Sequence, residues 1–220
     1  MPIYKRYDRD FFKHWSSDMA YILGFLFADG NLVKTNRGTY FTSFYTSDKN
    51  LLASMKGCLK SDHCISARRS KTGVVYRMQI GSKDLFSDLG DLGLTPNKAR
   101  RMNLPMVPKK YFGDFLRGFF DGDGNVWSGF LNRSRERPTH AIAVSFTSAS
   151  VSFLSGLLSS LRGRGIVGGS LYKIKSKNCA RLSFSTLDAL KIFSIMYTMP
   201  YRLFLLRKRL VFDRFIEMRP

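Results

Sequence analysis

ILGFLFADGN at Ile22 to Asn31 recurs as LRGFFDGDGN at Leu116 to Asn125, 94 residues further along a chain of 220. Such a doubled phrase predicts that the chain is built from two similar halves, each with an acidic residue at the same place. Five positions are identical between the copies: Gly24 and Gly118, Phe25 and Phe119, Asp29 and Asp123, Gly30 and Gly124, and Asn31 and Asn125.

Each phrase has the pattern of an apolar helix that ends at an Asp-Gly pair. Ser17 or Asp18 can cap the first helix, no charge occurs over the next turns, and Gly30 suits the left-handed conformation that often ends a helix. Small residues four positions apart share one helix face, and that face can approach another backbone closely. These residues are Gly24 and Ala28 in the first copy and Gly118 and Gly122 in the second.

Packing of the two helices through these faces would bring Asp29 and Asp123 side by side. A helix C-terminus carries roughly half a negative charge, so each carboxylate is disfavoured there by up to about 1 kcal/mol. The two carboxylates would also repel each other. A divalent cation between them removes both penalties, and oxygen ligands completed by water suit Mg²⁺. The alternative is that Asp-Gly is only a turn dipeptide, which its recurrence in matching contexts makes the weaker interpretation.

Both phrases resemble the signature of the LAGLIDADG homing endonucleases. The first copy departs from it at Phe27, where the signature has its first acidic residue, whereas the second copy follows it more fully with Asp121 and Asp123. The resemblance implies that the acidic residue before the final glycine binds metal, which maps onto Asp29 and Asp123 and places the following Gly30 and Gly124 at the metals. We expect Asp121 to be a solvated or pocket-edge carboxylate.

The similarity between the halves extends beyond these helices. Alternating stretches at Thr39 to Thr46 and Ala141 to Thr147 each precede a helical pattern, and Val74 to Leu85 corresponds to Asn178 to Leu190. Each half therefore reads helix, hairpin, helix, hairpin, helix. The expected fold class is α+β, with two αββαββα halves related by a pseudo-twofold axis, motif helices at the interface, and antiparallel sheets forming a DNA-binding saddle. The predicted boundaries are 1–101, a proline-containing linker at 102–110, and 111–220.

The first hairpin of the second half is expected to be longer. Thr46 follows Asp29 by 17 residues and Thr147 follows Asp123 by 24, so seven extra residues enter that hairpin. They fall in the basic stretch LNRSRERPTH at Leu131 to His140, whose bias favours phosphate contact over an ordinary solvated loop.

Composition points to a polyanionic partner. Lys and Arg total 36 against 16 for Asp and Glu, which gives a net charge of +20. A membrane-surface protein is the competing interpretation, but no long amphipathic helix with clustered lysines stands out. Hydrophobic residues form 44% of the chain, enough for a packed core. The sequence lacks an apolar run of eighteen residues, a signal-peptide pattern and a CxxC pair, so we expect a soluble intracellular protein of the cytoplasm, nucleoid or an organelle matrix.

The strands are expected to bind DNA, because a twisted antiparallel ribbon fits the major groove, where Arg prefers guanine and Gln prefers adenine. Lys173, Lys175 and Lys177 alternate and would give one basic face. The predicted contact residues are Arg37, Tyr40, Thr42, Arg68, Arg69, Lys71, Arg77 and Gln79 in the first half, and Arg133, Arg135, Arg137, Lys173, Lys175, Lys177 and Arg181 in the second.

The predicted function is site-specific, metal-dependent cleavage of double-stranded DNA. Two or three Mg²⁺ ions at Asp29 and Asp123 would activate water and assist the leaving oxygen. The resemblance also implies a basic residue beside the metals in each half, matched here by Lys98 and Lys208. It further implies a monomer that makes a staggered break at a long, partly asymmetric site, encoded in an intron, an intein or alone. Two alternatives stay open: an RNA-binding maturase that helps a host intron splice, and a DNA-binding regulator without catalysis. Two helix-end carboxylates that serve no reaction would cost stability, which argues against the regulator.

Overall fold

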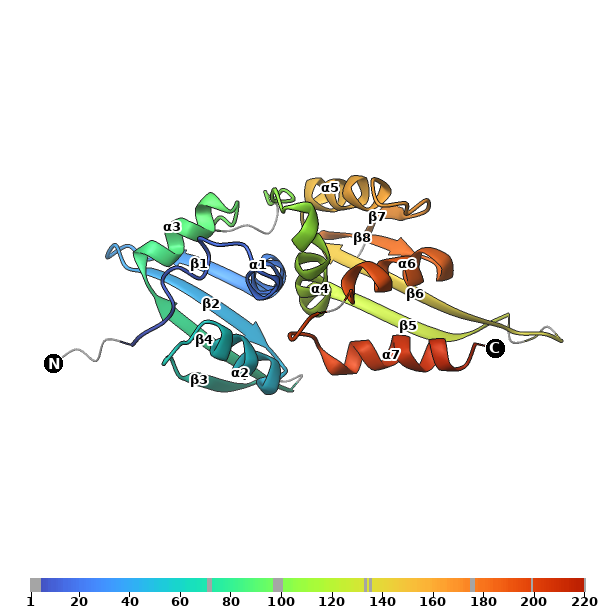
Figure 1. The fold of residues 1–220 in the computed structure, drawn as a ribbon, viewed down its shortest axis with the longest axis horizontal. Coiled ribbons are helices and arrows are strands. Elements are labelled where there is room, and N and C mark those ends of the chain that lie inside the picture. Colours follow the sequence, from blue (N-terminus) through green and yellow to red (C-terminus); the bar gives the residue numbers. More distant parts are fainter. Residues whose placement is uncertain are drawn as a thin grey trace.

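The computed structural model describes residues 5–70, 73–96, 101–132, 134, 136–174, 177–198 and 200–219. These residues form an α+β fold in which α1 and α4 lie side by side between two sheets (Figure 1). Five residues with predicted roles lie outside the described residues: Lys71, Lys98, Arg133, Arg135 and Lys175.

Both halves follow the predicted αββαββα order, and the second half adds a terminal helix. The first half contains α1 (Ser17–Asp29), β1 (Gly30–Lys34), β2 (Tyr40–Thr46), α2 (Lys49–Cys58), β3 (Ile65–Ser70), β4 (Gly73–Gly81) and α3 (Lys83–Asp91). After a 3₁₀ turn, η2 (Lys109–Tyr111), the second half contains α4 (Phe112–Asp123), β5 (Gly124–Leu131), β6 (Thr139–Ser148), α5 (Val151–Arg162), β7 (Ser170–Ile174), β8 (Cys179–Phe184), α6 (Thr186–Met196) and α7 (Leu206–Glu217).

Each half builds one antiparallel four-stranded sheet. The strand orders are β1-β2-β4-β3 and β5-β6-β8-β7, so the two sheets have the same topology. Arg77 pairs with Tyr45 in the first sheet and Arg181 pairs with Thr147 in the second, which gives the two arginines equivalent places. The predicted fold class is confirmed. The division at 1–101, 102–110 and 111–220 stays a prediction.

The length difference between the first hairpins is eight residues, and the predicted seven is wrong. Gly30 pairs with Phe44, fourteen residues later, whereas Gly124 pairs with Phe146, twenty-two residues later. The error is a one-residue slip in aligning two similar Thr-Ser pairs. The helix caps set the true alignment, because Asp48 caps α2 and Ser150 caps α5, each by accepting a hydrogen bond from the backbone three residues on.

The start and end of α1 differ from the prediction. Ser16 is the N-cap, with its hydroxyl accepting from the Met19 amide at 3.1 Å. Gly30 is extended (φ −90°, ψ 157°) and not left-handed, and Gly124 behaves in the same way. Glycine is required there for space: a Cβ on Gly30 would lie 2.5 Å from the Leu26 carbonyl oxygen. The chain thus turns from helix into strand by folding against its own last turn.

Contact between backbones holds α1 and α4 together. A Cβ on Gly24 would lie 2.0 Å from the Phe115 carbonyl oxygen, and a Cβ on Gly118 would lie 1.9 Å from that of Tyr21. Real Cβ atoms essentially never approach so closely, so glycine is the only residue that fits at either place. Every residue of α1 from Met19 to Phe27 is buried, because the helix is enclosed by α4 and by the sheet of its own half.

Each sheet has one face covered by helices. The large apolar residues of the central strands point to that face, including Phe44 and Met78 in one sheet and Phe146 and Leu182 in the other, all fully buried. In Figure 1, α2 and α6 are drawn in front of the strands of their sheets. We call the opposite face the open face; its residues alternate with these buried ones. No helix among the described residues is long and apolar enough to cross a membrane.

Gly24→Ala is expected to lower the free energy of unfolding by roughly 3 kcal/mol, because the new methyl group must push α1 and α4 apart. Urea denaturation of the purified protein measures the change. Gly90→Ala is the matched control: Gly90 also lies in a helix, but a Cβ there meets nothing within 4 Å. That variant should change stability by no more than about 1 kcal/mol, in the stabilising direction. Equal stability of the two variants would contradict the packing described for Gly24.

Candidate functional site

Two aspartates come together where α1 and α4 end. Asp29 is the last residue of α1 and Asp123 the last of α4, and each is followed directly by the first strand of its sheet. A Cβ on Gly122 would lie 2.3 Å from the Ala28 Cβ and 3.3 Å from Asp29 Oδ2. The carboxylate of one motif therefore lies against the backbone of the other, one residue before Asp123. Asp29 is half-buried and Asp123 is exposed.

Lys208 of α7 holds the end of α4. Its ammonium donates hydrogen bonds to the carbonyl oxygens of Phe120 (2.6 Å), Asp121 (2.9 Å) and Gly124 (2.6 Å). An ammonium has three protons, so these bonds use its full donor capacity. They tie the last turn of α4 to the first residue of β5, and they place a positive charge at the negative end of the helix dipole.

Burial and the neighbouring carboxylates have opposite effects on the pKa of the Lys208 ammonium. The side chain is 6% exposed. Burial lowers the pKa of the Lys208 ammonium to about 8, while the carboxylates of Asp121, Asp29 and Asp123 act in the opposite direction. The ammonium is thus close enough to both motif aspartates to interact with their charges. The sequence placed Lys208 near the site but gave no sign that it would bind the helix end.

Asp121 is buried, which corrects the expectation of a solvated or pocket-edge carboxylate. Its Oδ2 accepts hydrogen bonds from the Tyr21 hydroxyl (2.6 Å) and the Leu205 amide (2.8 Å), so it joins α1, α4 and the segment before α7. Its Oδ1 is buried and has no hydrogen-bond partner among the described residues. Burial raises the pKa of the Asp121 carboxyl to about 6, against the effect of the Tyr21 hydrogen bond and the Lys208 charge.

Phe27 occupies the place in the first motif that Asp121 occupies in the second. Its ring packs against Phe115 and Phe153, with centroids 5.6 and 6.1 Å apart. The departure of the first motif from the signature therefore has a structural reason: in one half this position anchors a polar segment, and in the other it fills an apolar core.

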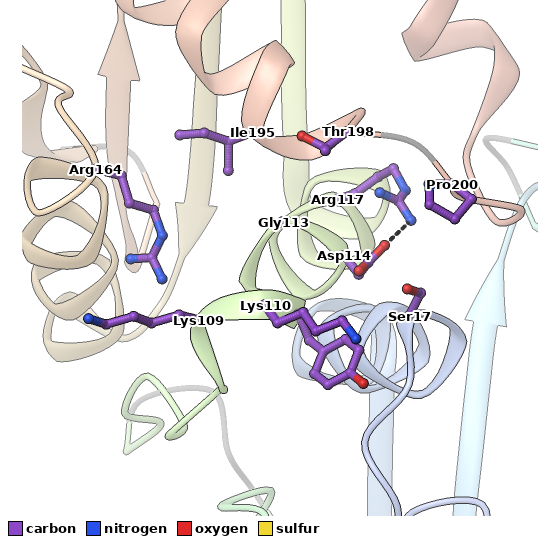
Figure 2. A pocket seen from close by; sticks show the side chains of 11 residues that line it. Ser17, Lys109, Lys110, Gly113, Asp114, Arg117, Arg164, Ile195, Thr198 and Pro200 are labelled. Carbon is purple, nitrogen blue, oxygen red and sulfur yellow. Dashed lines mark hydrogen bonds and ion pairs between the residues drawn. The ribbon is translucent and has the colours of Figure 1, made fainter.

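The opposite end of α4 is tied down by a buried arginine. Arg117 donates to the backbone carbonyls of Leu203 (2.9 Å) and Met196, and it forms an ion pair with Asp114 at 2.6 Å. A cavity of about 410 Å³ opens beside this pair (Figure 2). None of its lining residues is a predicted site residue, and it lies at the N-terminal end of α4, away from the aspartates.

The strand register shows which predicted DNA-contact residues lie on the open face of each sheet and which lie on the helix side. Arg77, Gln79 and Arg68 lie on the open face of the first sheet, and Arg181 lies on that of the second. The Arg181 Nε is buried without a hydrogen-bond partner among the described residues. Gln79 donates to the Ser43 hydroxyl at 3.2 Å. Arg37 and Arg137 lie in the connections of the two first hairpins, and Lys177 lies in the β7–β8 turn.

Four of the predicted contact residues lie on the helix side of their sheets. Thr42 is fully buried on the helix side, and Tyr40 on the same side packs edge-on against Phe86 of α3, with centroids 4.9 Å apart. Arg69 pairs with Val74 on that side as well. Lys173 pairs with Ala180, which is buried on the helix side together with Leu182. Lys173 therefore lies on the helix side too, and not on the basic face expected to contact DNA. The alternation of residues along a strand shows correctly which residues share a face. Which of the two faces the helices cover is shown by the large, fully buried apolar residues Phe44, Met78, Phe146 and Leu182.

The aspartate pair fits a hard divalent cation. It offers carboxylate oxygens and open space on the side of the exposed Asp123, and such oxygens are what Mg²⁺, Mn²⁺ and Ca²⁺ prefer. The predicted place of Gly124 at the metals fits less well, because its carbonyl oxygen already accepts from the Lys208 ammonium, whose positive charge repels a cation. The described part of the chain, this site included, has no cluster of three or more His, Cys, Asp or Glu residues that could hold a metal, so the site rests on the two aspartates and water.

Known structures share this architecture. Meganuclease I-SmaMI bound to uncleavable DNA matches with a TM-score of 0.59 and 14% identity, over 90% of both chains. LAGLIDADG meganuclease I-AabMI bound to uncleaved DNA matches with a TM-score of 0.60 and 16% identity, over 90% of this chain and 88% of that one. This is the LAGLIDADG meganuclease fold. I-DmoI in complex with DNA and Ca matches equally well, with a TM-score of 0.60 and 13% identity, over 90% of this chain and 97% of that one.

Sequence comparison is less informative than structure. No protein-family model matches the chain. An uncharacterized protein of Methanocaldococcus jannaschii is 30% identical over 118 residues, which cover 51% of this chain and 41% of that protein. The chain thus spans less than half the length of this relative.

Proposed function

We propose that this protein is a site-specific DNA endonuclease that hydrolyses one phosphodiester bond in each strand of a long, partly asymmetric target and leaves staggered ends. The observation that carries the proposal is the meeting of Asp29 and Asp123 at the paired ends of α1 and α4. Each open face begins at one of these aspartates, so a duplex that lies across both faces passes directly over them.

The fold and the charge support DNA as the substrate. Solved proteins with this fold, I-SmaMI, I-AabMI and I-DmoI, are bound to DNA. A net charge of +20 favours a polyanion over most other partners. Because both halves lie in one polypeptide and each supplies one aspartate, the active unit in this proposal is a monomer.

Divalent metal is proposed as the cofactor. I-DmoI has been solved with DNA and Mn and with DNA and Ca. In this chain Asp29 and Asp123 would hold the ions, with Mg²⁺ as the natural choice for oxygen ligands completed by water and two or three ions as the proposed number. Ions bound there supply an activated water and neutralise charge on the leaving oxygen.

The remaining residues of the site orient and support the aspartates. The hydrogen bonds from Lys208 fix the end of α4, and so the backbone from which Asp123 projects. Its charge also offsets the repulsion between the two carboxylates and the helix dipoles. These contacts support a positioning role for Lys208. Direct catalytic roles for Lys208 and Lys98 stay predictions. Arg77 and Arg181, at equivalent places on the two open faces, are proposed to contact one half of the target each.

Cleavage of a library of randomised duplexes tests the proposal. Purified protein with Mg²⁺ should linearise a subset of plasmids that carry random inserts, and the selected inserts should share a long, partly asymmetric sequence. EDTA should abolish cutting. If no plasmid is cut, the nuclease proposal fails; tight binding to intron RNA in the same preparation would then favour a maturase, and specific duplex binding would favour a regulator.

Asp29→Asn or Asp123→Asn should reduce cleavage of the selected target by at least about a hundredfold, because either change removes a metal ligand. Binding of the target in Ca²⁺ should change by no more than a few fold. Electrophoretic mobility and cleavage assays on the same samples measure both effects. Loss of binding in step with cleavage would mean that the aspartates support the structure and not the chemistry.

Arg77→Ala should weaken duplex binding and lower the slope of log affinity against log salt by about 0.9, if the side chain neutralises one phosphate. Arg69→Ala is the matched control, since it removes an exposed arginine from the same sheet but from the helix side. Fluorescence anisotropy of a labelled duplex at several salt concentrations measures both slopes. An equal effect of the two variants would refute the assignment of the open face to DNA.

A further inference from the structure

Trp127 is a large aromatic residue exposed on the open face of the second sheet. It lies on β5, four residues after Asp123, and its side chain is 44% exposed. Register places it opposite Ala143, and the flanking pair Val126 and Val144 points to the helix side. Leu131, on the same face of β5, is also exposed, and exposed apolar side chains that share one surface are a feature that marks contact sites.

The strands around Trp127 are shaped to hold its ring. A Cβ on Gly129 would lie 2.7 Å from Trp127 Cζ2 and 3.3 Å from both Cε2 and Cη2, so the six-membered ring lies directly over this glycine. The residues opposite on β6 are also small, Ala141 and Ala143. Glycine and alanine at these positions leave room for the indole to lie against the sheet, which fixes its place before any ligand binds.

The first half has neither a tryptophan nor a glycine at the two equivalent positions. The 94-residue offset of the motifs brings Val33 to the position of Trp127 and Thr35 to that of Gly129. A contact made by Trp127 therefore has no counterpart at the same position of the first half.

Accepting the proposed DNA endonuclease function, we propose that Trp127 is a specificity residue that makes apolar contact with thymine 5-methyl groups in the major groove of the half-site bound by the second half. Bases in an intact duplex are stacked, so an indole on a sheet surface meets their edges and not their faces. Of the groups at the major-groove edges, the thymine methyl presents the largest apolar surface. Contact with it removes apolar surface from water on both partners.

Intrinsic fluorescence tests whether Trp127 meets the duplex. The chain has two tryptophans, and Trp15 is half-buried and stacked on Tyr111, so Trp15→Phe leaves Trp127 as the single emitter. The probe is a labelled mixed-sequence duplex at low salt. Trp127 emission should change and saturate together with the anisotropy of the duplex. Unchanged emission during clear binding would overturn the inference, whereas unchanged anisotropy would mean that the proposed DNA binding itself has failed.

Replacing thymine by deoxyuridine tests the methyl contact. The same duplex is prepared with every thymine replaced by deoxyuridine, which removes only the methyl groups. The native protein should bind the thymine duplex about fourfold more tightly for each methyl group contacted. Trp127→Ala should lose this preference, and Trp127→Phe should retain part of it.

Leu187→Ala is the matched control. Leu187 is an exposed apolar residue on α6, which packs on the helix side of the same sheet, and its loss should leave the preference unchanged. Gly129→Ala, which forces the indole out of its place, should lower the preference as Trp127→Ala does. The inference is overturned if Trp127→Ala keeps the full preference for thymine, or if the native protein shows none. Circular dichroism of each variant confirms that the sheet is intact.

Discussion

The arrangement of this molecule depends on the direct contact between the backbones of α1 and α4. Gly24 and Gly118 each face a carbonyl oxygen of the other helix at a distance that no side chain permits. This contact sets the separation of the two helix ends, and with it the distance between Asp29 and Asp123. Since each helix passes directly into the first strand of its sheet, the same contact also sets how the two open faces lie relative to the aspartates.

A close pair of acidic helix ends is electrostatically unfavourable, and the chain compensates for it in one half more than in the other. Lys208 binds the carbonyl oxygens at the end of α4, and Asp121 accepts hydrogen bonds from Tyr21 of α1 and from the backbone before α7. The first half has Phe27 in the place of Asp121, packed in an apolar core. The two halves therefore share a fold but differ in how they support their aspartates. Trp127 on β5, with Val33 at its equivalent position, extends this asymmetry to the open faces.

Much of this architecture was predictable because the repeated phrase carries both the helix pattern and its glycines. The element order, the equivalent places of Arg77 and Arg181 in the two sheets, and the helix contact all follow from aligning the copies. Features that depend on how close atoms lie in three dimensions, or on which face of a sheet the helices cover, were not predictable from the sequence. Gly30 is required by its distance to Leu26 and not by a left-handed conformation, and Thr42 and Tyr40 alternate correctly but face the helices. The burial of Asp121 and the carbonyl contacts of Lys208 arise from α7, which has no counterpart in the described first half and so could not be found from the repeat.

The central claim is that Asp29 and Asp123 form one shared site and not two independent ones. Strand-resolved cleavage of the selected target, with each strand labelled separately and separated on a denaturing gel, tests it most directly. Asp29→Asn and Asp123→Asn should each slow the cutting of both strands by about a hundredfold or more, because both cuts depend on the pair. If each variant instead cut one strand at the native rate and spared the other, the aspartates would act independently and the shared site would be contradicted.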